Sequence, residues 1–177
     1  DIVIGAAGGS LIEDHQGNFW CTGDGILMFN PNEQNFRTIL TQDVVKKVFD
    51  NPLSKQAISQ SSPMDFVQMS NGKIYVGYYG IGIVEMDKNL RNPKFIKLPN
   101  GVSELIWKLF TPDGETLYFG DQKKQLYRYN VLTRQFVKFY QKQYRPAHLS
   151  ASFVESSRTV WLGFYNNEGL RRFDPIT

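Results

Sequence analysis

A chain of 177 residues is long enough for one domain that buries about 70% of its unfolded surface, and its 14% of aromatic residues favours β structure over helix. The net charge is only +3 and the lysines and arginines are scattered, which argues against a nucleic-acid-binding surface. The single cysteine, Cys21, excludes an intramolecular disulfide, and no apolar run approaches the ~18 residues of a membrane-spanning helix.

One pattern recurs four times: a short strand, a tight turn, a strand with an aromatic residue at its centre, and a third strand that ends in Asn or Asp. The central aromatics follow one another after 55, 43 and 43 residues: Trp20, Tyr75, Tyr118 and Trp161. A period near 43 residues is typical of one propeller blade. The sequence therefore predicts an all-β fold, a β-propeller segment of about four blades with four antiparallel strands in each blade. The two tryptophans are expected to anchor the core between blades.

The strands of these repeats can be placed along the chain. First strands are expected at 10–14, 65–69, 106–110 and 152–156. Third strands are expected at 26–30, 83–87, 126–130 and 170–174. Outer strands, in which Lys and Arg alternate with apolar residues as on an exposed edge, are expected at 35–39, 94–98 and 135–139. The blades of this single region, 1–177, are then 8–40, 64–99, 104–140 and 150–177.

The fourth repeat has no outer strand after its third. The apolar segment 1–7 either supplies that strand and closes a ring of four, or belongs to a preceding blade of a larger ring. We favour the larger ring, of which this region would be a fragment, because Asp1 carries no start signal.

An insertion at 41–63 lengthens the first spacing. Residues 43–49 have helical spacing, Thr41 or Asp43 can cap a helix there, and Asn51 followed by proline can end it. This predicts a short helix in a loop between blades. The insertion could be a ligand lid or a partner contact, but we favour a surface loop without a role because loops tolerate added length at little cost.

The loops between second and third strands open beside the central channel of a propeller. Aromatic rings next to Asn and Asp suit a sugar, because its C–H surface stacks on rings while its hydroxyls need polar partners. The candidate ligand-binding residues on these loops are Asp24, Tyr78, Tyr79, Asp121, Phe164, Tyr165 and Asn166. The alternative is that these aromatics pack between neighbouring blades.

No pattern indicates catalysis, a metal or a cofactor. His15 lies in a turn without other ligands at metal-binding spacing, and His148 is interpreted as a loop residue in the same way. Glu13 and Asp14 are neighbours in a strand, so they point to opposite faces and are expected to orient the turn. Cys21 is interpreted as a small buried hydrophobic residue.

Residues 11–22, with their acidic pair, Gly-Asn turn and tryptophan strand, resemble the two-component regulator propeller repeat. The resemblance continues at Gly25-Ile26 and at Phe29-Asn30-Pro31. The fourth copy matches the same repeat at 161–163, 169–170 and 172–175. The second and third copies depart from it, since tyrosine replaces tryptophan and Gln125 stands where glycine is expected.

The resemblance implies a ligand-sensing extracytoplasmic region of a bacterial hybrid two-component histidine kinase, of the kind that Bacteroidetes use to detect complex carbohydrates. It implies a periplasmic location, an oligosaccharide ligand, signalling by conformational change, and a membrane connection only through other parts of the parent protein; it also allows a homodimer. No enzymatic activity and no cofactor are expected of this region. The alternatives are a propeller enzyme, such as a lactonase or a glycosidase-like hydrolase, and a generic protein-interaction propeller.

Overall fold

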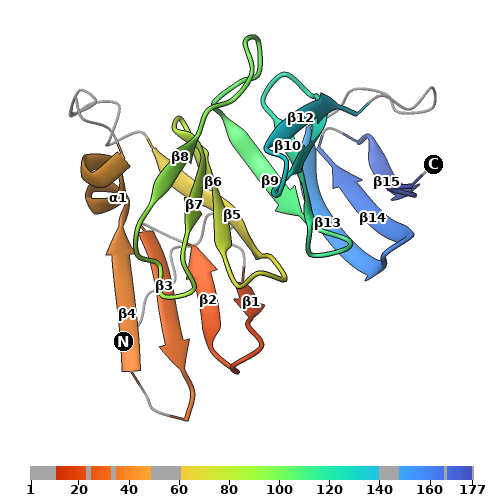
Figure 1. Ribbon diagram of the computed structural model, residues 1–177. Helices are drawn as coiled ribbons and strands as arrows, with labels where there is room; N and C mark the ends of the chain where they lie inside the picture. Colours follow the sequence, from red (N-terminus) through yellow and green to blue (C-terminus); the bar gives the residue numbers. More distant parts are fainter. Residues whose placement is uncertain are drawn as a thin grey trace.

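The computed structural model describes residues 11–22, 25–32, 35–48, 61–139, 148–165 and 167–176. These residues form four antiparallel sheets that lie side by side as the blades of a β-propeller (Figure 1). In each sheet the strands follow one another in chain order, so each blade is a simple meander. The prediction of an all-β propeller segment with about four blades is therefore confirmed.

The described strands are as follows. Blade 1 consists of β1 (Leu11–Glu13), β2 (Phe19–Thr22), β3 (Gly25–Asn30) and β4 (Asn35–Leu40). Blade 2 consists of β5 (Ser62–Gln68), β6 (Ile74–Tyr79), β7 (Gly82–Met86) and β8 (Lys94–Ile96). Blade 3 consists of β9 (Ile106–Phe110), β10 (Thr116–Asp121), β11 (Leu126–Asn130) and β12 (Gln135–Lys138). Blade 4 consists, within the described residues, of β13 (Leu149–Ser156), β14 (Thr159–Phe164) and β15 (Gly169–Phe173).

Two inner strands are longer than the sequence suggested. β5 begins at Ser62 and β13 at Leu149, three residues before the starts expected for them. In both strands the register shifts near the start, between Pro63 and Asp65 and between Leu149 and Ala151. A bulge of this kind lets pairing continue past an irregular residue, which a simple alternation pattern does not reveal.

The insertion after blade 1 contains the expected short helix, α1 (Thr41–Val48). Val44 and Val45 are buried in the same hydrophobic cluster as Trp20 and Ile26, so the helix packs against blade 1. The predicted helix end at Asn51 lies outside the described residues.

The four central aromatics occupy equivalent positions, since each pairs with an apolar residue of its inner strand: Ile12 with Trp20, Val67 with Tyr75, Phe110 with Tyr118, and Phe153 with Trp161. The first three are buried, as is Cys21. Trp161 is half-buried, and its indole N–H donates to Glu155 Oε2 at 2.7 Å. The expectation that both tryptophans anchor the core holds for Trp20, while Trp161 is covered only in part.

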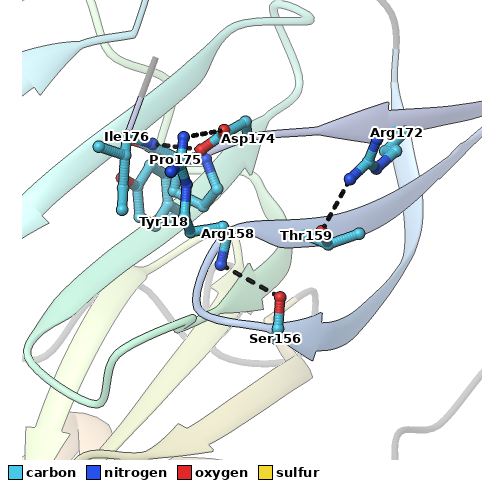
Figure 2. Close-up of polar contacts among 8 residues, drawn as sticks. All are labelled: Tyr118, Ser156, Arg158, Thr159, Arg172, Asp174, Pro175 and Ile176. Atoms are coloured by element: carbon cyan, nitrogen blue, oxygen red, sulfur yellow. Dashed lines mark hydrogen bonds and ion pairs between the residues drawn. The ribbon is translucent and has the colours of Figure 1, made fainter.

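Glycines two residues after Tyr75 and Tyr118 let adjacent blades approach closely. A Cβ on Gly77 would lie 2.8 Å from Ile106 Cγ2, and a Cβ on Gly120 would lie 2.9 Å from Leu149 Cβ. Real Cβ contacts are longer, so the aliphatic side chain of the next inner strand occupies the space that a larger residue would need. Blades 3 and 4 are also joined by a hydrogen bond, which the Tyr118 hydroxyl donates to the Pro175 carbonyl at 3.2 Å (Figure 2).

The turn before the aromatic strand of blade 1 is organised by Asp14. Its carboxylate accepts hydrogen bonds from the backbone N–H groups of Gln16 and Asn18 and from the indole of Trp20, at 2.8, 3.0 and 2.9 Å. Burial alone would raise the pKa of Asp14, but these hydrogen bonds and one from the Asn18 amide outweigh it and lower the pKa. Asp14 therefore orients the turn as predicted, whereas the Glu13 side chain is exposed.

Candidate functional site

Three rings, from blades 2 and 4, gather around Trp107 of blade 3 at one end of the propeller. The Trp107 ring centroid lies 5.6 Å from that of Tyr79, 5.9 Å from that of Tyr165 and 6.4 Å from that of His148. Both tyrosines meet the indole edge-to-face, an arrangement that aromatic rings favour. We call these four residues the Trp107 cluster.

The topology explains why these residues meet. Tyr79 is the last residue of β6, Tyr165 follows directly after β14, Trp107 lies at the start of β9, and His148 precedes β13. In a meander, the end of a second strand and the start of an inner strand lie at the same end of the blade. Residues from blades 2, 3 and 4 therefore converge there.

Backbone hydrogen bonds hold the segments that carry the cluster. Gly80 N–H donates to the Glu104 carbonyl at 3.2 Å, and Gln122 N–H donates to the Leu105 carbonyl at 2.9 Å. Tyr165 N–H donates to the His148 carbonyl at 3.0 Å. Because each bond joins two different loops, the rings are carried on backbone that is fixed at several points.

Side chains add to this support. The Trp107 indole N–H donates to the Gln122 side-chain oxygen. Asp121 is buried, and its carboxylate accepts the Ser103 and Gln125 backbone N–H groups at 3.1 and 2.9 Å. Asp121 thus fixes the loop that leads into Trp107.

The surface of the cluster is accessible. Tyr165 is 51% exposed, and Tyr79, Trp107, His148 and Gln122 are half-buried. Ring faces and edges in this position can make contacts with a ligand while their backbone remains fixed.

The structure brings together two of the seven residues that the sequence proposed, Tyr79 and Tyr165. Tyr78 is 1% exposed within the core between blades 1 and 2, and burial raises the pKa of its phenol. Phe164 lies in the core between blades 3 and 4, with the Arg171 guanidinium 4.5 Å from its ring centroid. Tyr78 and Phe164 therefore pack between neighbouring blades, which is the alternative that the sequence left open for the loop aromatics. Asp121 is buried and supports the loop, and Asp24 and Asn166 lie outside the described residues.

Sequence reasoning missed Trp107, Gln122 and His148. Trp107 was placed inside an inner strand and was not considered as a ligand contact, and His148 was interpreted as a loop residue. One signal could have found Trp107. It is the second residue of its strand and therefore lies at the end of the blade where the loops with the candidate ligand-binding residues are expected.

A cavity of about 570 Å³ lies between the four inner strands and is lined by residues of β1, β5, β9 and β13. Lys108 Nζ approaches Asp65 Oδ2 at 3.2 Å in this cavity, and the same oxygen accepts the Leu109 backbone N–H at 2.9 Å. His15 is exposed at its rim, with Nδ1 3.2 Å from the Gln68 side-chain oxygen. Among the described residues, no three His, Cys, Asp or Glu side chains come together as metal ligands. No helix of the described part is long and apolar enough to cross a membrane.

No protein-family model matches the chain, and no curated protein sequence matches it. Solved structures do match. The extracellular domain of the hybrid two-component system BT3049 from Bacteroides thetaiotaomicron has a TM-score of 0.64 at 13% identity, over 94% of this chain and 20% of that one. An auxiliary nutrient-binding protein from the same organism has a TM-score of 0.67 at 12% identity, over 93% of this chain and 37% of that one.

A third match is the β-propeller domain of Cps50 (Swd1) from Myceliophteria thermophila. Its TM-score is 0.59 at 16% identity, over 89% of this chain and 52% of that one. The likeness is one of fold. The chain spans about a fifth of the BT3049 domain, and none of these three neighbours is described as an enzyme.

Proposed function

We propose that this region is a ligand-binding extracytoplasmic part of a bacterial hybrid two-component sensor, that it is periplasmic, and that it binds a carbohydrate at the Trp107 cluster. The repeat that the sequence resembles supports the sensor assignment. The fold shared with an extracellular domain of a hybrid two-component system supports it as well. The proposal assigns binding to this region, not catalysis.

The observation that carries the proposal is the meeting of Tyr79, Trp107 and Tyr165 from three blades at one accessible place. Sugars present C–H surfaces that pack on aromatic rings, and their hydroxyls need donors and acceptors. The cluster offers both kinds of contact, because the phenol hydroxyls, the His148 imidazole and the Gln122 amide lie among the rings. A purely apolar ligand would leave these polar groups without a role.

The position of the cluster suggests how binding becomes a signal. A ligand that contacts Tyr79, Trp107 and Tyr165 at once touches blades 2, 3 and 4, so its affinity depends on the angles between those blades. Such a ligand favours one arrangement of the blades over another and transmits only the difference in its affinity for the two.

The test is a thermal-shift screen of the 177-residue chain against oligosaccharides, followed by calorimetric titration with the best hit. A ligand bound only by the folded state raises the melting temperature. Trp107→Ala is expected to weaken the affinity at least about tenfold, because one stacked aromatic contributes on the order of 1–2 kcal/mol. Leu132→Ala is the matched control, since Leu132 is exposed on the turn between β11 and β12.

Two results would contradict the proposal. Equal affinity of the Trp107→Ala variant and the unchanged chain would show that the ligand does not bind at the Trp107 cluster. Turnover of a lactone or glycoside substrate by the chain would show that its activity is catalytic.

A further inference from the structure

The three blade junctions follow one rule. In blades 1, 2 and 3 one sheet face, which we call the trailing face, turns toward the next blade and is buried by it. The trailing face of blade 2 contains Val67, Tyr75, Gly77, Ile83 and Glu85, and its apolar members share a hydrophobic cluster with blade 3. Blade 1 follows the same rule, because Trp20 and Ile26 share a cluster with apolar residues of blade 2.

Blade 3 repeats the arrangement at the same positions. Its trailing face contains Phe110, Tyr118, Gly120, Leu126 and Arg128. Phe110 and Leu126 are 2% and 1% exposed, because Val160, Leu162, Phe164 and Phe173 of blade 4 cover them.

The trailing face of blade 4 carries the same kinds of residue but is open. It contains Phe153, Trp161, Gly163, Leu170 and Arg172. Phe153 is 64% exposed and Leu170 is 66% exposed, in contrast to their buried counterparts in blade 3. Two large apolar side chains beside a half-buried tryptophan form an exposed apolar surface of the kind that marks an interaction site.

The glycine on this face points to the chemistry of the partner. Gly77 and Gly120 each receive an aliphatic residue of the next inner strand, Ile106 and Leu149. At Gly163 the three nearest atoms all belong to Ser150 and Ala151 of its own sheet. The space beside Gly163 thus matches an Ile or Leu near the start of another inner strand.

We propose that the trailing face of blade 4 is the docking surface for a further blade of the same polypeptide, whose inner strand places an Ile or Leu on Gly163. The comparison with Cps50 supports this occupant, because the present four-blade arrangement matches only 52% of that propeller domain. A blade of the same polypeptide is also held at high effective concentration, which favours it over a second copy of the chain.

Polar groups at the edge of this face are compatible with such a junction. Arg172 Nη2 donates to Thr159 Oγ1 at 3.2 Å, and Arg158 Nη2 pairs with Asp174 Oδ2 at 3.0 Å (Figure 2). The charge of Arg158 therefore already has an acidic partner. The Thr159 hydroxyl does not neutralise Arg172, so this guanidinium has to stay in solvent at the junction, as its exposed counterpart Arg128 does in blade 3.

The experiment measures how fast a single thiol on this face reacts. Leu170→Cys is introduced with the buried Cys21 changed to Ala, and its reaction with a disulfide reagent is followed in the 177-residue chain and in the longest chain that the gene encodes. In the 177-residue chain the new thiol should react at the rate of an exposed cysteine. In the longest chain we expect the rate to fall at least about tenfold, because reaction then requires local opening of the junction.

Leu132→Cys serves as the exposed control, and its rate should be the same in both chains. Phe153→Cys provides a second probe of the face in case Leu170→Cys disturbs folding. The proposal would be overturned if the thiol at position 170 or 153 reacted equally fast in both chains. It would also be overturned if the longest chain contained no further blade. Protection that appears in the 177-residue chain and grows with its concentration would overturn it too, because the occupant would then be a second copy.

Discussion

Strand β6 supplies aromatic residues to two regions that use them differently. Near its start, Tyr75 is buried at the junction of blades 2 and 3, where its hydroxyl donates to Glu85 Oε2 at 2.6 Å. At its end, Tyr79 is half-buried and meets Trp107 edge-to-face in the Trp107 cluster. Four residues along one strand thus separate a ring that holds the fold together from a ring that is available to a ligand.

The difference teaches that position along the strand, not residue type, decides the role of an aromatic residue on the face that blade 2 turns toward blade 3. On this face the Tyr75 ring lies between the two blades and is covered by both. The Tyr79 ring, at the strand end on the same face, keeps part of its surface. The two regions should therefore respond in opposite ways to substitution: the junction by losing stability, the cluster by losing ligand.

The largest effect on stability is expected at the junction of blades 3 and 4. Tyr118 stacks on Phe110 at 5.1 Å and meets Phe173 and Phe139 edge-to-face at 5.7 and 6.1 Å. Tyr118→Ala removes this packing and leaves a cavity, which should lower the free energy of unfolding by about 3–5 kcal/mol. Urea unfolding measures the change.

Tyr118→Phe is the matched control for this prediction. It keeps the ring and loses the hydroxyl, with its hydrogen bond to the Pro175 carbonyl, so the expected loss is about 1 kcal/mol. If the alanine variant were no less stable than the phenylalanine variant, packing of the central aromatic would not hold the blades together.

A smaller effect is expected from the ion pair at the junction of blades 2 and 3. Burial opposes ionisation of Glu85, but hydrogen bonds from Lys73 and Tyr75 and the positive charges of Lys73 and Arg134 outweigh it and lower the pKa. Glu85→Gln should lower the free energy of unfolding at pH 7 by about 1–3 kcal/mol, because the Lys73 ammonium and the tyrosine hydroxyl lose a charged acceptor.

The pH dependence of this effect follows from the direction of the pKa shift. Since the pKa of Glu85 is lower in the folded than in the unfolded chain, the stabilisation is complete above the ordinary value of 4.5 and is lost as the pH falls through the folded value. The difference between the Glu85→Gln variant and the unchanged chain should therefore shrink below about pH 4. A difference that stayed constant down to pH 3 in denaturant titrations would show that the charge of Glu85 is not what stabilises the junction.

The same comparison shows what the sequence could predict. Tyr75 and Tyr118 were identified as blade centres because their roles recur with the repeat, and a recurring pattern can be read without coordinates. The short helix was also readable, since its spacing and start signals are local. The order of strands within each blade follows from the repeat, because consecutive short strands joined by tight turns form a meander.

The candidate site was predictable only in part, because it depends on distances between blades. Tyr79 and Tyr165 were proposed from their loops, but their meeting at Trp107 joins residues that lie far apart in the chain. Tyr78 and Tyr79 are adjacent in an apolar strand that is covered on both faces, so alternation could not tell which ring is buried. Which of the two rings is buried depends on how blades 1 and 3 lie against the end of β6, and the sequence of one strand does not contain this information.

The smallest effect on stability, and a large one on binding, is expected at Tyr165. About half of its side chain is exposed, and the hydrogen bond from its N–H to the His148 carbonyl belongs to the backbone and survives substitution. Tyr165→Ala should therefore lower the free energy of unfolding by no more than about 1 kcal/mol, the contribution of one aromatic pair. Ligand affinity, measured by calorimetry, should fall by about tenfold as the stacking surface is lost.

Tyr165→Phe separates the two contributions of this residue. The ring and its edge-to-face contact with Trp107 at 5.9 Å remain, so stability should not change, while any hydrogen bond from the hydroxyl to the ligand is removed. Affinity between that of the alanine variant and that of the unchanged chain would assign both stacking and hydrogen bonding to Tyr165. A loss of stability in Tyr165→Ala as large as that in Tyr118→Ala would mean instead that the Tyr165 ring is part of the blade junction. The distinction between rings that stabilise a junction and rings that are available to a ligand would then be wrong for Tyr165, the most exposed ring of the Trp107 cluster.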